Sequence, residues 1–471
     1  MGRSHAVQPV QIRLGVTLFG VSAMEKVQFV LSCVLGLLFV TVGTSFAQGP
    51  SVDDPELIPE VARIEESPEN EEETEETQDD VEELERRIDL LAEELERLRS
   101  GEGERELSAD EARAMGLAPS AAAVFRANRG LSIAGYGEFL YENYASTKQS
   151  GAAGGKGTQF DALRAIIYTG YRFNDKWVFN SEIEVEHAKE AYLEFAYVDY
   201  QATEHFGIRG GMLLVPMGLV NEFHEPTVFL GTERPFTENK IIPSTWRENG
   251  TGIYGTFDKV SFRLYTVNGF QGDKFSSGGL RGGRQKGYKA KADSMAVTGR
   301  LDVTPTPGVF VGASFYTGGA NFAMDTDDLG LTIVDVHGQA QVRGFDVRGL
   351  YATANLDAVA KFNEKQGLTG SKGLAEKMEG GYVLFGYNVL SQTSDIGGPA
   401  FTPYFKFERV DTQAKMPAGY SRSLSTLNNF RTIGFEFKPI PNVVVKVDRM
   451  WVTNDAKSGL DQFNINLGYG F

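Results

Sequence analysis

The stretch QFNINLGYGF, residues 462–471, alternates strictly between apolar positions and polar or glycine positions. Its apolar positions are Phe463, Ile465, Leu467, Tyr469 and Phe471. Successive side chains of a strand point to opposite faces, so this pattern predicts a strand with one apolar face and one polar face. A chain that ends on such a strand, with an aromatic last residue, differs from the loose polar terminus usual in soluble proteins.

Sixteen candidate strands, this one included, follow residue 130, and helical periodicity is almost absent from that region. The tenth shows the alternation well, because Asp335, His337 and Gln339 share one face while Val334 and Val336 share the other. The predicted strands are 131–144, 160–173, 177–189, 192–203, 206–218, 247–257, 260–270, 294–304, 309–320, 331–343, 345–356, 379–390, 401–411, 430–440, 442–452 and 460–471.

The connections between these strands alternate in length. Those after even-numbered strands are mostly tight, such as NDK at 174–176, whereas those after odd-numbered strands are mostly longer. Short turns on one rim and long loops on the other are typical of outer-membrane barrels, and an even strand number brings both ends of the barrel to the short-turn rim. The sequence therefore predicts an all-β fold, a 16-stranded antiparallel transmembrane β-barrel over 131–471. We expect its last strand to close the ring, with Asn464 and Asn466 facing the lumen.

A large soluble β-sandwich is the alternative, because its strands also alternate where one face is wet. The two classes of connection and the aromatic residues near predicted strand ends, for example Tyr171, Trp177 and Trp451, favour the barrel. An export signal favours it too.

That signal begins at Met24 and has a basic start at Lys26, a 16-residue apolar stretch over 27–42 and small residues before a cleavage point after Ala47. Residues 1–47 are thus expected to be an upstream extension and a signal peptide, with either Met1 or Met24 as the true start. A retained helical anchor and a lipoprotein signal at Cys33 are the alternatives.

The charge of the chain is concentrated in its first part. The first 130 residues hold 12 Lys and Arg against 27 Asp and Glu, whereas the rest hold 34 against 36. Residues 48–80 are rich in Glu, Asp, Thr and Pro and predict a disordered acidic linker. Residues 81–99 predict a short α-helical coiled coil, or a single solvated amphipathic helix, and 100–130 predict a linker containing Gly, Ala and Ser. The coiled-coil seam is Val81, Leu84, Ile88, Leu91, Leu95 and Leu98.

One block of the barrel region resembles the corresponding part of the phosphate-selective porins O and P. It runs from Arg209 to Gly255 and reads RGGMLLVPMGLVNEFHEPTVFLGTERPFTENKIIPSTWRENGTGIYG. The shared features are a strand ending in Pro-x-Gly, a long loop with Glu-Arg, then Pro-x-x-x-Arg and a Gly-rich strand. The resemblance implies a sixteen-stranded trimeric porin with a periplasmic coiled coil. It also implies a phosphate preference based on a ladder of arginines, which the sequence alone does not show.

The connection 219–246 is the longest on its rim, at 28 residues. The third outer loop of porins typically folds into the lumen, so we expect this loop to narrow the channel, with opposite charges setting its selectivity. The expected constriction residues are Glu222, His224, Glu225, Glu233, Arg234, Glu238 and Lys240. The expected pore-lining cations are Arg164, Arg172, Arg209, Arg263, Arg300, Arg343, Arg348, Lys406 and Lys446, and the anions are Asp335, Glu182, Glu184, Glu186, Glu436 and Asp448. The alternative is that each charge only keeps the lumen wet or pins a loop.

Enzymatic motifs are absent from the sequence. The segment GGKGT at 154–158 lacks the Ser or Thr and the first glycine of a P-loop, and no G-x-S-x-G occurs. The five histidines show no ligand spacing and there is one cysteine, so no metal or cofactor is expected.

The predicted function is that of an outer-membrane porin for passive diffusion of small hydrophilic solutes or ions. The basic loop 274–291 could attract anions such as phosphate, and the glutamates of the third strand oppose this. The alternative is a structural protein that tethers the membrane to the cell wall through its periplasmic coiled coil. Expected partners are membrane lipid and lipopolysaccharide, two further copies in a homotrimer, the barrel-assembly machinery during insertion, and peptidoglycan through the leader. No nucleic acid is expected.

Overall fold

The computed structural model describes residues 86–89, 107–125, 130–323, 328–394 and 397–471. The expected signal peptide and acidic linker lie outside the described residues. Of the expected coiled coil, residues 86–89 are described, and they are helical. Within the described part of the chain, no helix has the length and apolarity needed to cross a membrane.

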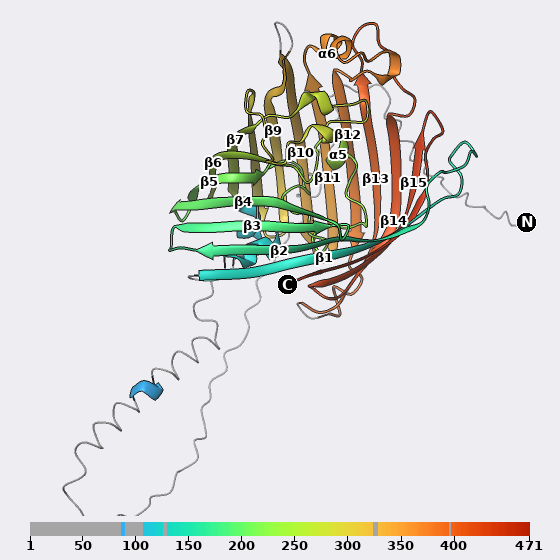
Figure 1. Ribbon diagram of the computed structural model, residues 1–471. Coiled ribbons are helices and arrows are strands. Elements are labelled where there is room, and N and C mark those ends of the chain that lie inside the picture. The colour runs from blue at the N-terminus through green and yellow to red at the C-terminus, as the bar shows by residue number, and fades with distance from the viewer. Residues whose placement is uncertain (1–85, 90–106, 126–129, 324–327, 395–396) are drawn as a thin grey trace, which may run out of the picture. The chain divides into compact units, whose positions relative to one another are not determined.

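Sixteen antiparallel strands form a closed barrel, in which each strand pairs with its neighbours in sequence and β1 pairs with β16 (Figure 1). Closure satisfies the backbone of every strand, as a lipid environment requires. The strands are β1 (Gly130–Tyr144), β2 (Gln159–Arg172), β3 (Trp177–Glu186), β4 (Glu190–Thr203), β5 (Phe206–Leu214), β6 (Arg247–Phe257), β7 (Val260–Asn268), β8 (Met295–Thr306), β9 (Val309–Ala323), β10 (Asp328–Val342), β11 (Phe345–Leu356), β12 (Lys377–Tyr387), β13 (Ala400–Lys415), β14 (Leu427–Ile440), β15 (Val443–Asn454) and β16 (Gln462–Gly470). The predicted fold class is confirmed.

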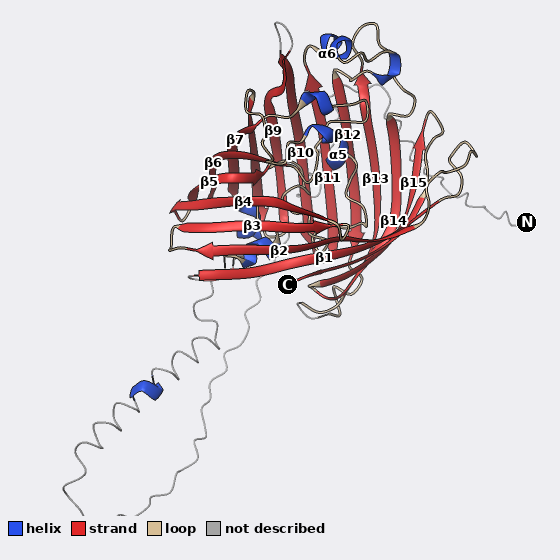
Figure 2. Cartoon of the chain, viewed as in Figure 1, coloured by secondary structure: helices blue, strands red, loops and turns tan. Residues whose placement is uncertain are grey.

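The remaining elements are short helices in the connections and inside the barrel (Figure 2). They are α3 (Ala109–Ala114), α4 (Pro119–Ala123), α5 (Thr237–Lys240), η2 (Gly272–Lys274), η3 (Arg281–Gly283), α6 (Val359–Lys365) and η4 (Gly370–Lys372).

The two faces of the barrel wall differ as the alternation predicts. In β16 the side chains of Asn464 and Asn466 are buried in the lumen, whereas Ile465 and Leu467 are about two-fifths exposed on the outer face. The register from Tyr136 opposite Gly470 to Tyr144 opposite Gln462 closes the ring. The apolar outer face and the closed hydrogen-bonding pattern together make the domain a transmembrane β-barrel.

Local backbone chemistry shifted three predicted boundaries. Strand β3 ends at Glu186 because His187 and Ala188 adopt left-handed φ angles of 55° and 50°. Strand β5 ends at Leu214, before Pro216, which has no N–H to donate to the sheet. Arg343 was expected to line the pore and does not. It lies exposed in the turn between β10 and β11, with φ of 50°, so its side chain does not continue the alternation of β10.

The expected linker 100–130 was wrong for its described part. Residues 107–125 form α3 and α4, which lie inside the barrel at the short-turn end (Figure 1). Ser108 caps α3 in a reciprocal capping box with Glu111. The small side chains of this segment suggested a flexible linker, but Ala112, Ala121 and other alanines are buried against the barrel wall.

Candidate functional site

The lumen is crossed by residues 215–246, the connection from β5 to β6, which we name the inner loop. The side chain of Asn221 forms hydrogen bonds with both ends of this loop, where the chain leaves and re-enters the sheet. Its side-chain amide donates to the carbonyls of Val215 (2.7 Å) and Trp246 (2.9 Å), and its oxygen accepts from the Trp246 N–H at 2.6 Å. All three groups are buried, so these hydrogen bonds hold the loop inside the barrel rather than over its rim.

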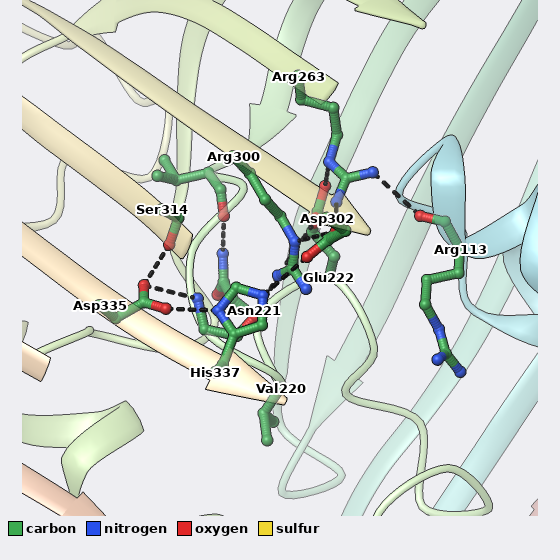
Figure 3. Close-up of polar contacts among 12 residues, drawn as sticks. Arg113, Val220, Asn221, Glu222, Arg263, Arg300, Asp302, Ser314, Asp335 and His337 are labelled. Carbon is green, nitrogen blue, oxygen red and sulfur yellow. Dashed lines mark hydrogen bonds and ion pairs between the residues drawn. The ribbon is translucent and has the colours of Figure 1, made fainter. Parts of the chain in front are cut away.

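On one side of the lumen, the inner loop contacts a charged network on β7 to β10 (Figure 3). Glu222 of the loop lies 3.2 Å from Arg263 and 3.9 Å from Arg300. Asp302 pairs with both arginines, and its other oxygen contacts His337 at 2.8 Å.

The network continues beyond His337. That ring also contacts Asp335 at 2.6 Å, and Asp335 accepts from Ser314 and from the Gly218 N–H of the inner loop, the latter at 3.3 Å. Gly218 has φ of 73°, and a Cβ there would lie 2.3 Å from Glu238, so the close turn of the loop requires glycine. Ser314 donates to Asp335, while the two ring nitrogens of His337 contact Asp335 and Asp302.

On the opposite side, the inner loop is held by polar groups of β12 to β15. Lys446 donates to the carbonyls of Phe229 (2.7 Å) and Gly231 (3.1 Å). Further contacts are Thr232 N–H to Asp448 at 2.9 Å, Thr237 N–H to Glu408 at 2.6 Å, Tyr382 hydroxyl to Glu238 at 2.6 Å and Lys406 to the Glu233 carbonyl at 3.5 Å. The inner loop therefore spans the lumen from wall to wall.

Residues 107–125, which we name the inner segment, close the region below the inner loop. Three wall arginines donate to backbone carbonyls at the ends of its short helices. Arg263 reaches the carbonyls of Arg113 (3.0 Å) and Ala114 (2.7 Å), Arg209 reaches that of Met115 (3.1 Å), and Arg172 reaches that of Phe125 (3.4 Å). Cations suit the carbonyl-rich end of a helix, so these contacts are electrostatically favourable.

The inner segment also binds the inner loop directly. Glu225 accepts hydrogen bonds from the Ser120 N–H at 2.9 Å and the Ser120 hydroxyl at 3.0 Å. Burial raises the pKa of the Glu225 carboxyl to about 7, although the Ser120 hydrogen bonds oppose that rise. Nearby, Gly170 lets the segment approach β2, because a Cβ there would lie 1.7 Å from Val124.

Between the inner segment, the inner loop and the wall, a cavity of about 10 Å³ remains. It is lined by Leu117, Tyr168, Glu182, Arg209, Glu222, His224 and others. A cavity of this volume holds about one water molecule. Little free space is therefore left between these three parts of the barrel at this level.

Cations gather at the outer end of the lumen. Residues 269–294, the connection from β7 to β8, fold over the inner loop, with Leu280 N–H donating to the Lys240 carbonyl at 3.0 Å and Arg284 donating to the Thr245 carbonyl at 2.6 Å. Burial and the neighbouring Arg284 lower the pKa of Arg281 to about 9, and burial likewise lowers that of Lys240. These pKa values are lowered because buried, positively charged side chains lie close together in this cluster.

The predicted site residues fall into three groups. Glu222, His224, Glu225 and Glu238 are buried in contacts between the inner loop and its surroundings, and Glu233, Arg234 and Lys240 are partly buried. Arg164, Arg172, Arg209, Arg263, Arg300, Arg348, Lys406, Lys446, Asp335, Glu182, Glu184, Glu436 and Asp448 lie on the lumen side, and Glu186 lies at the outer end of β3. Many of these charges pair with each other instead of facing across an open gap.

Sequence reasoning missed two components. Asp302 joins Arg263, Arg300 and His337, and its alternation with Arg300 in β8 could have placed it in the lumen. The inner segment gave no signal, because its alanines are equally typical of a linker. Among the described residues, no group of three or more His, Cys, Asp or Glu side chains is arranged to hold a metal ion.

Several solved structures and one protein of known sequence are similar to the chain. No protein-family model matches the chain, so membership of the phosphate-selective porins stays a prediction. Among solved structures, Salmonella typhi OmpF in complex with daunomycin is 13% identical with a TM-score of 0.48, covering 73% of this chain and 98% of its own. An anion-selective porin from Comamonas acidovorans is 10% identical with a TM-score of 0.46, covering 72% and 99%. These likenesses concern the fold alone.

A protein of Aquifex aeolicus (strain VF5), described as uncharacterized, is 38% identical over 364 residues. The match covers 74% of this chain and 80% of that protein. The chain therefore belongs to the same family as this Aquifex aeolicus protein, and it is a sixteen-stranded outer-membrane β-barrel.

Proposed function

We propose that the protein is an outer-membrane channel for small hydrophilic solutes and ions, closed by the inner segment in the described conformation. One observation carries this proposal: the lumen wall is polar and incompletely satisfied by protein. Within the described residues, the buried oxygens Glu182 Oε2, Glu408 Oε2, Glu436 Oε2 and Asn466 Oδ1 receive no hydrogen bond. A buried carboxylate oxygen that receives no hydrogen bond is costly in a dry interior, so this wall suits a water-filled passage.

The barrel width supports the same function. Barrels of sixteen strands enclose an aqueous channel unless something fills them, whereas eight strands are enough for a solid, side-chain-filled wall. A purely structural tether, the second candidate, needs neither this width nor a charged interior.

Three features support release of the inner segment from the lumen. It pairs with no strand, its helices are short, and wall arginines hold it mainly through backbone carbonyls. We propose that its withdrawal joins the small cavity beside Glu182 to the short-turn end of the barrel. Planar-bilayer recordings of the full chain and of a variant without residues 107–125 test the function, and the absence of current from both folded proteins would overturn it.

We further propose that the open channel prefers anions. The outer mouth brings together Arg234, Arg247, Arg281, Arg284, Lys240 and Lys286, against the carboxylates of Glu186, Glu194 and Glu248. Release of the inner segment would also remove the carbonyls that Arg172 and Arg209 bind near the short-turn end, while Arg209 stays paired with Asp199. Cationic linings raise the local concentration of anions.

The double variant Arg281→Gln, Arg284→Gln tests this preference. In a salt gradient, the channel without residues 107–125 is expected to show an anion-to-cation permeability ratio above one, and the double variant is expected to bring that ratio closer to one. Arg343→Gln is the control, because Arg343 is an exposed cation in a turn at the other rim. A ratio below one in the channel with all its arginines would contradict the proposal.

The pKa of Glu225 predicts how channel closure depends on pH. With the segment bound, burial raises that pKa to about 7, and we expect exposure to water after release to lower it towards the ordinary value of about 4.3. The closed form thus holds a proton that the open form has lost, so binding of the segment is strongest in acid and weakens as the pH rises towards 7, by on the order of 3 kcal/mol.

Mean current through the full chain is therefore expected to rise between pH 5 and pH 7.5. In the variant Glu225→Gln the amide cannot titrate, so this part of the rise should disappear and the current at pH 7.5 should resemble that of the unmodified protein at pH 5. A steeper rise in the variant, or a fall with pH in the unmodified protein, would show that Glu225 does not control closure.

A further inference from the structure

The outer face of the barrel carries three arginines on neighbouring strands: Arg409 on β13, Arg431 on β14 and Arg449 on β15. Each is exposed. In β1 to β11, by contrast, the Lys and Arg side chains of the described strand residues lie on the lumen side: Arg164, Arg172, Arg209, Arg247, Arg263, Arg300 and Arg348. We name Arg409, Arg431 and Arg449 the outer arginine patch. A cation on the lipid-facing side of a barrel is unfavourable unless it lies near the headgroups.

The strand register places these arginines next to one another. Arg431 lies opposite Phe407, which is two residues before Arg409, and Arg449 lies opposite Ile433, which is two residues after Arg431. Diagonal neighbours of this kind are about 7–8 Å apart, within reach of long side chains. The three guanidinium groups can therefore contact a single ligand.

The tilt of the strands brings this diagonal close to one depth in the membrane. A row of paired residues starts at Val443, at the short-turn end of β15, and passes through Tyr469, Gly137 and Ala165 to Val185, at the long-loop end of β3. Each row of paired residues therefore lies closer to the long loops on each successive strand in chain order. From β13 to β15, each arginine lies two residues closer to the short turns than the residue paired with the preceding arginine. This displacement offsets the shift of the rows towards the long loops.

That depth is the boundary between the apolar band and the polar rim. Below the patch, the outward positions of β13 are Phe401, Pro403, Phe405 and Phe407, and those of β14 are Ile433, Phe435 and Phe437. Above it, Asn429 of β14 and Thr453 of β15 occupy outward positions and are partly exposed, whereas Asp411 of β13 is buried. Trp451 lies directly opposite Arg431, and tryptophan is typical of the membrane interface. Long loops of outer-membrane barrels face the cell exterior, so this boundary belongs to the outer leaflet.

The charges around the patch leave it with an excess of positive charge. Lys377 pairs with Glu379 at 2.9 Å, Arg422 pairs with Asp411 at 2.5 Å, and Arg449 lies 3.6 Å from Asp461. Arg409 donates to the neutral side chain of Asn429 at 3.3 Å, and Arg431 forms no ion pair with a described residue. A further anion is needed to neutralise them.

We infer that the outer arginine patch binds the phosphate groups of an anionic lipid headgroup in the outer leaflet. Guanidinium groups form paired hydrogen bonds with phosphate oxygens, and the apolar band below the patch accommodates the acyl chains. A second copy of the chain fits less well, because the nearby carboxylates, Glu379 and Asp411, already pair with Lys377 and Arg422.

Titration of the purified full chain in detergent with bisphosphorylated lipid A, followed by native mass spectrometry, tests the inference. The triple variant Arg409→Gln, Arg431→Gln, Arg449→Gln is expected to bind this lipid on the order of 100-fold more weakly, and Arg431→Gln alone about fivefold more weakly. Lipid A without its phosphates should bind the unmodified protein as weakly as intact lipid A binds the triple variant.

The matched control replaces three exposed cations of the short-turn rim, Lys176, Lys259 and Arg343, by Gln. It removes the same charge and should leave lipid binding unchanged, and circular dichroism verifies the β-structure of every variant. Undiminished binding by the folded triple variant and by Arg431→Gln would overturn the inference. A changed oligomeric state with unchanged lipid binding would also overturn it and assign the patch to a contact between copies.

Discussion

Deletion of residues 107–125 is expected to raise the time-averaged current through planar bilayers by on the order of 100-fold. Hydrogen bonds from Arg263, Arg209 and Arg172, together with those between Ser120 and Glu225, hold the inner segment in the lumen. Contacts of this kind contribute about 1 kcal/mol each, so together they keep the open form to about 1% or less. Without the segment, the route beside Glu182 stays open to the short-turn end.

The matched control for this deletion is the removal of residues 81–99, the expected coiled coil. That variant keeps the inner segment, so its mean current should stay near that of the full chain. Equal currents from the two deletion variants would contradict the assignment of closure to the inner segment. Large currents from the full chain itself would show that the segment does not close the channel in a membrane.

The substitution Arg263→Gln is expected to have two effects at once. Arg263 is almost fully buried, pairs with Glu222 and Asp302, and donates to the carbonyls of Arg113 and Ala114. Breaking a buried ion pair from one side leaves an uncompensated charge and lowers the free energy of unfolding by about 3–5 kcal/mol. The inner segment loses two of its hydrogen bonds, so openings should become frequent.

Arg164→Gln separates these effects. Arg164 is also a wall arginine of the lumen, but its ion pairs are with Glu138 at 3.6 Å and Glu184 at 3.7 Å, both on strands of the wall and outside the inner segment. We expect this variant to unfold at lower denaturant concentration, with a current close to that of the unmodified protein. If Arg164→Gln opens the channel as often as Arg263→Gln, general destabilisation explains the openings, and the contact with α3 does not.

The fold was largely predictable because its determinant is local. Alternation in stretches such as 462–471 gave all sixteen strands, since lipid on one side and a polar lumen on the other impose a period of two on every strand. Where prediction failed, a single backbone feature was responsible, as with Pro216 after β5 or the left-handed Arg343 after β10. The same alternation identified many of the lumen-facing charges, but Asp302, Arg247, Glu194, Asp199 and Glu408 were missed.

The state of the lumen was decided by contacts between residues far apart in the chain. Ser120 and Glu225 are 105 positions apart, and Arg263 binds carbonyls 149 and 150 positions away. An alanine-rich sequence is equally compatible with a flexible linker and with a packed inner segment, because small side chains are common in both. The sequence by itself determined a barrel with an apolar exterior and a charged interior. Only the tertiary structure decided that these charges hold an inner loop and an inner segment across the passage, because the partners of a buried charge are set by three-dimensional proximity rather than by local pattern.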